Sequence, residues 1–404
     1  MDAMGRAARD AAEILRGIPA KQRSEAICAM ARHIRRRSSQ ILDANAKDVA
    51  CATTMIDRLR LDEQRLEAMA AALDDIARLP DPIGQVMARW TRPNGLELTR
   101  VRTPIGVIAM IYESRPNVTA DAAAICVRSG NSIILRSGSE ALGSALAIGC
   151  AIADGLDETG LPGTSVQVVP TADREAVGMM LDGLGGTIDL VIPRGGRALV
   201  ERVTADARVP VLGHLEGVCH TYVHCSADAD MAANVVRNAK MRRVGVCGAT
   251  ETLLIDRAAA SVILPRIAAA LGDCELRGDD EARAIEPMAQ AVESDWHTEY
   301  LAPVLAVKIV ATIDDAIDHI RRYGTGHTEA IIAEDRQAAE LFLDRVDSGI
   351  VLWNASTQFA DGGEFGFGAE IGIATGKLHA RGPIGPEQLT TFKYQVRGAG
   401  QIRP

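Results

Sequence analysis

Residues 104–136 have the sequence PIGVIAMIYESRPNVTADAAAICVRSGNSIILR, and this stretch decides the fold. The apolar run from Ile105 to Ile111 predicts a buried strand. Asp121 to Arg128 then predicts a helix, and Ser132 to Leu135 a second strand. Continuous apolar strands between helices are typical of parallel sheets covered on both faces. The stretch therefore predicts a doubly wound α/β domain.

The same alternation continues on both sides of this stretch. Further helices are expected at residues 140–158, 174–181 and 196–204, and further strands at 166–169 and 188–192. A second run of the same kind begins near Asp228, with strands at 252–255, 304–310, 330–333 and 350–353. Helical spacing of apolar residues fills 3–78, while 96–101 and 389–394 predict short strands. We therefore expect two α/β domains and small strand elements for self-association.

Composition excludes several classes of protein. The 404 residues are too many for one compact core. A net charge of −9 argues against nucleic acid or an anionic membrane as a partner, and we assign the basic run at 35–37 to a solvated helix face. No signal peptide or membrane helix is expected, and the eight scattered cysteines indicate a reducing, cytoplasmic compartment.

Cys247 is the candidate nucleophile. It lies in RVGVCGATET, residues 243–252, between an expected helix and an expected strand. Gly245 and Gly248 allow backbone N–H groups to approach whatever the sulfur attacks. The alternative is an ordinary buried cysteine, the usual state of a free thiol.

A second cluster, GHLEGVCHTYVHC at 213–225, contains residue types that bind metals. If 218–225 form a strand, His220 and His224 share a face but stand about 13 Å apart. One ion cannot collect these side chains, so we expect no metal site.

Two strand-to-helix junctions are candidates for phosphate binding. They are residues 135–140, LRSGSE, and 192–197, IPRGGR. Each places small residues and an arginine where the N–H groups of a helix N-terminus suit phosphate. We interpret both as dinucleotide contacts.

The sequence resembles the γ-glutamyl phosphate reductases (glutamate-5-semialdehyde dehydrogenases) of the aldehyde dehydrogenase superfamily. The similarity runs in order from about Ala11 to Tyr394. Its most specific blocks are SRPNVTADAA at 114–123, IPRGG at 192–196 and KLHARGPIG at 377–385.

The resemblance implies an aldehyde dehydrogenase-like fold with a dinucleotide-binding domain, an α/β catalytic domain and a small β element for oligomerisation. We expect the dinucleotide-binding domain at 1–225, with a strand excursion near 95–103, and the catalytic domain at 226–352. Residues 353–385 would return to the cofactor and active-site region, and 386–404 would form the oligomerisation tail.

The resemblance also implies an activity: NADPH-dependent reduction of L-glutamyl 5-phosphate to L-glutamate 5-semialdehyde and phosphate, in proline biosynthesis. Cys247 would form a thioester, with Asn117 as an oxyanion donor. Residues expected to contact NADP(H) are Arg136, Ser137, Ser139, Pro193, Arg194, Gly195, Gly196 and Glu299.

Two departures from the superfamily pattern concern the turn and a base. Hydrolytic relatives carry a glutamate in ELGGK, whereas here HLEGVCH at 214–220 places Glu216 nearby without GGK. Glu216 is therefore either a base or a structural residue. Gly248 stands where many relatives have asparagine, which would loosen the turn.

Substrate contacts are less specific. Arg115, His379 and Arg381 could meet a carboxylate or phosphate, and Asn354 and Ser356 are expected near the thiol. The resemblance further implies a homo-oligomer, dimer or tetramer, and a transient glutamate 5-kinase partner. A hydrolytic aldehyde dehydrogenase is the alternative enzyme, and an inactive scaffold the alternative from another class.

Overall fold

The structure is a computed structural model that describes residues 1–53, 56–367 and 370–403. The chain forms two compact units. Unit 1 comprises Met1–Gly213, Gly366–Gly372 and Ile384–Pro404, and unit 2 comprises His214–Phe365 and Ile373–Pro383. Within the described ranges, the chain therefore passes between the units several times.

Unit 1 is built on a parallel sheet with the strand order β5-β4-β3-β6. These strands are β3 (Val107–Tyr112), β4 (Ser132–Arg136), β5 (Val166–Val168) and β6 (Leu190–Arg194). Every residue of β3 is buried, as its apolar sequence predicts. The strand starts two residues later than expected because Gly106 has a φ of 136°, outside the β region, and the Asp189 carboxylate accepts the Val107 N–H at 2.8 Å.

Helices surround this sheet. They are α1 (Asp2–Gly17), α2 (Ala20–Arg36), α3 (Ser38–Cys51), α4 (Ile56–Leu59), α5 (Glu63–Arg78), α6 (Asn117–Arg128), α7 (Leu142–Glu158), α8 (Arg174–Leu181) and α9 (Arg197–Asp206). Helix α6 begins four residues before the expected start, which places Asn117 in its first turn. The expected long helical N-terminal region is confirmed.

One stretch of unit 1, Ser139–Glu158, is long and apolar enough to cross a membrane by length and composition. The sequence analysis expected no such stretch. Half of it is buried inside the protein, and α7 packs against α2 and α3. A helix of a folded core has the same apolar composition, because it is apolar on most of its circumference.

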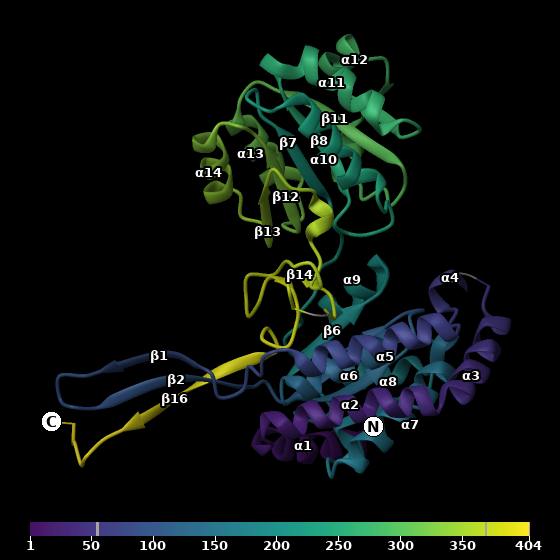
Figure 1. The fold of residues 1–404 in the computed structure, drawn as a ribbon, viewed down its shortest axis with the longest axis vertical. Helices are drawn as coiled ribbons and strands as arrows, with labels where there is room; N and C mark the ends of the chain where they lie inside the picture. The colour runs from purple at the N-terminus through teal and green to yellow at the C-terminus, as the bar shows by residue number, and fades with distance from the viewer. Residues whose placement is uncertain (54–55, 368–369, 404) are drawn as a thin grey trace. The chain divides into compact units, whose positions relative to one another are not determined.

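A three-stranded antiparallel sheet projects from unit 1 as an arm, with the order β1-β2-β16 (Figure 1). Its strands are β1 (Val86–Thr91), β2 (Glu97–Pro104) and β16 (Thr390–Arg397). Strand β16 pairs with β2 over its whole length, from Thr390 opposite Pro104 to Arg397 opposite Glu97. The excursion and the C-terminal strand expected from the sequence thus lie side by side.

Unit 2 contains a seven-stranded parallel sheet with the order β10-β9-β11-β8-β7-β12-β13. Its strands are β7 (Cys219–Val223), β8 (Thr250–Asp256), β9 (Glu275–Gly278), β10 (Ala289–Gln290), β11 (Val304–Val310), β12 (Thr328–Ile332) and β13 (Ile350–Trp353). A short hairpin, β14 (Ile373–Ala374) with β15 (Gly382–Pro383), completes the unit.

The helices of unit 2 are α10 (Ala229–Met241), α11 (Arg257–Leu271), α12 (Asp280–Ile285), α13 (Ile313–Tyr323) and α14 (Arg336–Arg345). Asp228, Asp256 and Thr312 cap the N-termini of α10, α11 and α13 through side-chain hydrogen bonds. Two large apolar clusters lie in the core. One includes buried residues of α10, α11 and α12, and the other includes buried residues of α13 and α14.

The division between units differs from the expected one. Unit 2 begins at His214 rather than after residue 225, because β7 pairs with β8 and β12 and so belongs to the second sheet. Residues 353–385, expected to form one return segment, are divided between the two units.

Candidate active site

Cys247 lies in the turn between α10 and β8, at the amino-terminal end of the parallel sheet of unit 2. The residue is half-buried. Helix α10 ends before the turn, and the strand β8, buried throughout, follows it. Cys247 is therefore fixed between two rigid elements.

The backbone of this turn is closely packed. A side chain at Gly217 would collide with the carbonyl of Cys247, so only glycine fits there. A β-carbon at Gly248 would lie 3.1 Å from the Thr357 carbonyl oxygen. The expected loosening of the turn at Gly248 is thus not seen; the missing side chain allows close contact with the short helix Thr357–Phe359.

A second thiol supports the turn. Cys219 is buried, and its Sγ donates to the Cys247 carbonyl oxygen at 3.1 Å. Burial holds the pKa of the Cys219 thiol well above its ordinary value. Cys219 therefore remains a protonated thiol, and of these two cysteines only Cys247 is placed to react.

Two histidines stand beside Cys247. One ring nitrogen of His214, one of His327 and the Cys247 Sγ all lie within 4.8 Å of one another. The two rings meet edge to face with centroids 4.9 Å apart. His214 Nδ1 lies 2.6 Å from the Ile373 carbonyl oxygen, and His327 Nδ1 lies 2.9 Å from Thr328 Oγ1. Sequence analysis missed this group, because His327 is 80 positions from Cys247 in the chain.

Two glutamates lie close to the same turn. Glu299 Oε1 accepts the N–H of Gly217 at 3.0 Å. Burial, with a smaller contribution from the charge of Glu216, raises the pKa of Glu299. Gly217 thus connects Glu299 to the Cys247 turn, and Glu216 is near enough to act on it electrostatically.

A buried ion pair joins the end of α10 to the start of β8. Lys240 Nζ donates to Glu251 Oε2, and both side chains are fully buried. Burial raises the pKa of Glu251 to about 7, and the ammonium of Lys240 opposes this shift. The pair holds the two elements that flank Cys247.

The expected substrate residues of unit 2 have structural partners. Asn354 binds both backbone groups of Ala333 through its amide, at 2.9 Å each. Arg381 binds the carboxylate of Asp347 at 2.6 Å. Ser356 is buried and caps the helix Thr357–Phe359, and His379 is exposed. The Asn354 amide and the Arg381 guanidinium thus already serve the packing of unit 2.

In unit 1, the candidate cofactor residues lie at the carboxyl ends of β4 and β6. Arg136 Nη2 donates to the Ala172 carbonyl at 2.7 Å. Among the described residues, the buried Arg136 Nε and Ser137 Oγ have no hydrogen-bond partner. Ser139 is exposed in the turn that follows. Buried polar groups are normally paired, so these two atoms suit a bound polar ligand.

The second junction joins β6 to α9. Pro193 is buried, Arg194 is half-buried, and Gly195 and Gly196 are exposed. The Glu113 carboxylate accepts the N–H of Gly196 at 2.9 Å. An acceptor with negative charge thus already occupies the N-terminus of α9, the position that favours anions.

Asn117 and Arg115 lie in the loop and first turn that follow β3. The Asn117 side chain is exposed and donates to Asp121 Oδ2 at 2.9 Å. Burial raises the pKa of Asp121 to about 6, while the Asn117 amide and Arg194 lower it. Asp121 therefore orients the Asn117 amide, which the family resemblance predicts to be an oxyanion donor.

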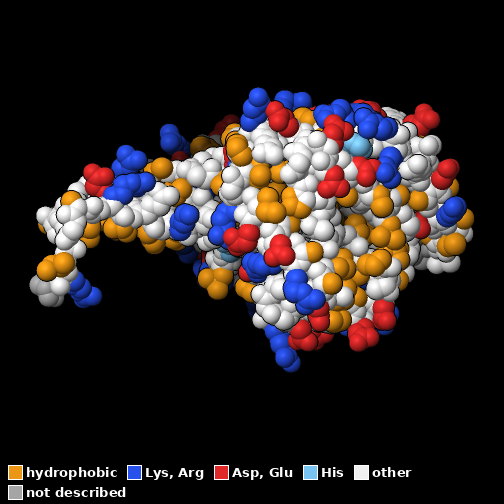
Figure 2. All heavy atoms as spheres, turned by 90° about the horizontal axis from the view of Figure 1, so that it is seen from below, with side chains coloured by type: hydrophobic (Ala, Val, Ile, Leu, Met, Phe, Trp, Pro, Cys, Tyr) orange, Lys and Arg blue, Asp and Glu red, His pale blue; other side chains and the backbone are white. Residues whose placement is uncertain are grey.

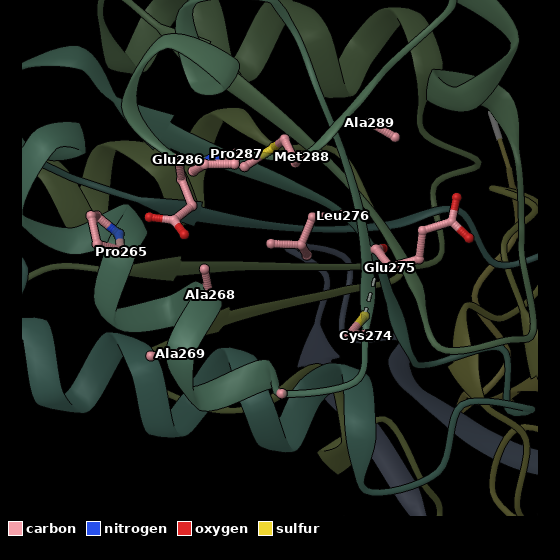
Figure 3. Close-up of a pocket in the computed structure, with 11 residues that line it drawn as sticks. Pro265, Ala268, Ala269, Cys274, Glu275, Leu276, Glu286, Pro287, Met288 and Ala289 are labelled. Carbon is pink, nitrogen blue, oxygen red and sulfur yellow. Dashed lines mark hydrogen bonds between the residues drawn. The ribbon is translucent and has the colours of Figure 1, made fainter.

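A separate hollow in unit 2 lies between α11 and the strands β9 and β10 (Figure 3). Its only cysteine, Cys274, donates to the Glu275 carbonyl at 3.8 Å, and burial raises its pKa to about 11. A buried thiol with a raised pKa is a poor nucleophile, and β11 lies between β9 and β8 in the sheet.

Known proteins resemble this chain over most or all of its length. The aldehyde dehydrogenase family model matches residues 1–297 and 289–370. The gamma-glutamyl phosphate reductase of Caulobacter vibrioides is 63% identical over 413 aligned positions, covering 100% of both chains. That of Parvibaculum lavamentivorans is 57% identical, covering 100% of this chain and 97% of the relative.

Solved structures extend the likeness to the fold. The gamma-glutamyl phosphate reductase of Thermotoga maritima has a TM-score of 0.96 at 42% identity, covering 100% of this chain and 99% of that one. An acetylating aldehyde dehydrogenase from Geobacillus thermoglucosidasius has a TM-score of 0.69 at 18% identity, covering 100% and 97%. The second likeness concerns the fold alone.

Proposed function

The chain belongs to the γ-glutamyl phosphate reductases, a family of aldehyde dehydrogenases that reduce glutamyl phosphate in proline biosynthesis, and we propose that it does so with NADPH through a thioester on Cys247. The observation that carries the proposal is the fixed Cys247 turn with two histidines beside the thiol. The products are L-glutamate 5-semialdehyde and phosphate.

The first half of the reaction is acyl transfer to sulfur. His214 or His327 takes the proton of the Cys247 thiol, and the thiolate attacks the carbonyl carbon of the acyl phosphate. The Cys247 N–H and the Asn117 amide are the proposed donors to the oxyanion. The bond from carbon to the phosphate oxygen then breaks, phosphate leaves with the electron pair, and a thioester remains.

The second half returns the free enzyme. When bound, NADPH supplies the hydride for this reduction. The thiohemiacetal oxyanion left by this reduction collapses, the carbon–sulfur bond breaks and the aldehyde departs. Cys247 leaves as a thiolate, to which the histidine that took the thiol proton can return it. No water is activated in this sequence, so we propose a structural and electrostatic role for Glu216, beside Glu299, rather than that of a base.

Residues of unit 1 fit NADP(H). Ser137 Oγ and Arg136 Nε are buried without a hydrogen-bond partner in the described part of the chain. Burial lowers the pKa of Arg136. The charge of Glu140 opposes this shift, and the charges of Arg174 and Arg202 add to it. Three guanidinium groups near the end of β4 suit the extra phosphate that distinguishes NADP from NAD.

The remaining cofactor contacts follow from the same junctions. We propose Ser139 beside the adenosine end, the turn of Pro193, Arg194, Gly195 and Gly196 at the pyrophosphate, and Glu299 at the nicotinamide ribose. Binding of phosphate at Gly196 requires the Glu113 carboxylate to leave that N–H, because two anions cannot share one donor at close range.

Of the residues that the sequence analysis named, we propose Arg115 as the main contact for the carboxylate or phosphate of the substrate. His379, exposed beside the short hairpin of unit 2, is the second candidate. Arg381, Asn354 and Ser356 are already engaged in packing, and we propose that they shape the pocket rather than bind substrate.

The arm of unit 1 supports the proposal of a homo-oligomer, a dimer or tetramer. Val86, Met87, Trp90, Phe392, Tyr394 and Val396 are exposed on it. Figure 2 shows hydrophobic side chains along the projecting arm. Large exposed apolar side chains gathered on a strand surface mark an association site. A cytoplasmic location and a transient glutamate 5-kinase partner remain part of the proposal.

The test is NADP⁺ reduction by glutamate 5-semialdehyde, with and without phosphate, for the wild type and Cys247→Ala. The proposal expects NADPH formation that requires phosphate and disappears in the variant. Turnover without phosphate would instead indicate a hydrolytic aldehyde dehydrogenase. Activity in Cys247→Ala would show that Cys247 is not the nucleophile.

A further inference from the structure

We propose that Cys247, His214 and His327 form a binding site for one soft divalent cation such as Zn²⁺, and that the bound ion blocks the thiol. One thiolate and two imidazoles are ligands that Zn²⁺ prefers. They come from three separate parts of unit 2: the segment before β7, the turn before β8 and the residue before β12. Binding does not depend on the proposed function, but inhibition of the enzyme does.

The distances suit this site. Zinc bonds of about 2.0–2.3 Å bring tetrahedral ligand atoms to roughly 3.5 Å from one another. The three candidate atoms already lie within 4.8 Å of one another. Side-chain shifts on the order of 1 Å therefore close the site, and tetrahedral coordination leaves a fourth position for water.

The outer contacts of the histidines also suit a metal. A metal-bound histidine usually donates its other N–H to a carbonyl or similar acceptor. The carbonyl of Ile373 can only accept, so His214 Nδ1 carries the proton and Nε2 has the lone pair. His327 Nδ1 lies against Thr328 Oγ1 and Cys219 Sγ, and the proposal assigns its Nε2 to the metal.

A second cluster provides the contrast. His224, Cys225 and Asp256 also lie within 4.8 Å of one another, at the opposite end of β7 and β8. There the Ser226 N–H donates to His224 Nδ1 at 3.2 Å, and the Asp256 carboxylate caps α11 through the Ala258 N–H. The Tyr222 hydroxyl donates to the other Asp256 oxygen at 3.3 Å, so both carboxylate oxygens already accept hydrogen bonds, and the proposal excludes this cluster.

Binding converts the Cys247 thiol to a metal-bound thiolate and releases its proton to solvent. No electron is transferred, so removal of the ion by a chelator restores the nucleophile. The site would therefore make inhibition of the enzyme by zinc reversible.

The experiment titrates the metal-free full-length protein with Co²⁺, whose bond to a thiolate gives a sulfur-to-metal absorption band. We expect one Co²⁺ per chain and displacement by Zn²⁺. The band should be absent in Cys247→Ser, and affinity should fall at least ~10-fold in His214→Ala. The matched variants Cys225→Ser and His224→Ala should behave as wild type. A band that survives in Cys247→Ser, or disappears in Cys225→Ser, would overturn the assignment.

A second measurement uses only the wild type, so it does not depend on the folding of a variant. Iodoacetamide labelling of each cysteine is followed by mass spectrometry with and without Zn²⁺. Zinc should slow labelling of Cys247 roughly 10-fold or more, and a chelator should restore it, while the exposed Cys51 and Cys150 are unaffected. Equal labelling of Cys247 in both conditions would refute the site.

Activity in metal-free buffer separates the two proposals. If phosphate-dependent turnover occurs but Co²⁺ does not bind, the metal site is wrong and the proposed function stands. If Co²⁺ binds at Cys247 but turnover is absent without metal, the proposed function is wrong and the site stands.

Discussion

The two parallel sheets of this chain carry their candidate functional residues at opposite ends. In unit 1, Arg136, Ser137 and the turn of Gly195 and Gly196 follow the carboxyl ends of β4 and β6. In unit 2, Cys247, His214 and His327 precede the amino ends of β7, β8 and β12. The usual rule for open α/β sheets, that ligands bind at the carboxyl ends, describes only the first.

The difference has an electrostatic basis. Carboxyl ends of parallel strands adjoin helix N-termini, whose partial positive charge suits the phosphates of a dinucleotide. The turn of Cys247 instead follows the C-terminus of α10, where a thiolate gains nothing from the helix dipole. Two histidines lie beside the sulfur instead, and we propose that one of them takes the thiol proton. Four predictions test this contrast.

The largest expected effect separates the two ends of the second sheet. Cys247→Ser should reduce phosphate-dependent activity by roughly 10³-fold or more, since the nucleophile is lost. Cys225→Ser, at the carboxyl end of β7, should change activity less than about twofold, because that thiol lies outside the catalytic turn. Initial rates of NADPH formation measure both. Comparable losses in the two variants would mean that both ends of the sheet take part.

The next effect concerns the support of the amino end. Lys240→Met leaves Glu251 buried without its partner and should lower the free energy of unfolding by about 3–5 kcal/mol. The control is Arg257→Met at the exposed pair with Glu281, which should change the free energy of unfolding far less because solvent screens that pair. Urea unfolding measures both. If the two substitutions cost the same, the buried pair is not what holds the Cys247 turn.

A smaller effect is expected at the carboxyl end of the first sheet. Arg174→Ala and Arg202→Ala each remove a positive charge near Arg136 and should raise KM for NADPH roughly 5–10-fold, without changing KM for NADH. Arg208→Ala, at an exposed pair with Asp182, is the control. Equal changes for the two cofactors would show that these arginines do not recognise the extra phosphate.

The smallest effect is a pH dependence at Asp121. Burial raises its pKa from 3.8 to about 6 in the folded protein. The folded state thus favours the protonated carboxyl, and this stabilising contribution is complete below pH ~4 and lost as pH rises through ~6. Asp121 is half-buried, so solvent screening reduces the effect. The free energy of unfolding of Asp121→Asn should therefore rise by only about 0.5–1 kcal/mol relative to that of the wild type between pH 5 and pH 8. A stability difference that is constant across this range would contradict the shifted pKa.

Much of this arrangement could be predicted from local sequence. The apolar run that became β3 and the turn around Cys247 depend on neighbouring residues, whose patterns are visible in the chain. Cys247 and Asn117 remain proposals as functional residues, but their places in the fold follow from the strands and helices around them.

Other features depend on partners that are remote in sequence. The sequence did not predict the short strands β9 and β10 or the strand β1. Pairing with β11, β9 and β2, respectively, defines them rather than an apolar pattern of their own. His327 gave no signal beyond its position before an expected strand. Its proximity to Cys247 follows from the order of β7, β8 and β12 in the sheet.

The pairing of β2 with β16 has a consequence for synthesis of the protein. Arg102 and its hydrogen-bond partner Thr390 are 288 positions apart, so β16 is synthesised long after β2. Until then, β2 has an unpaired edge, the kind of surface on which nascent chains aggregate. A chain truncated before β16 keeps that edge of β2 open.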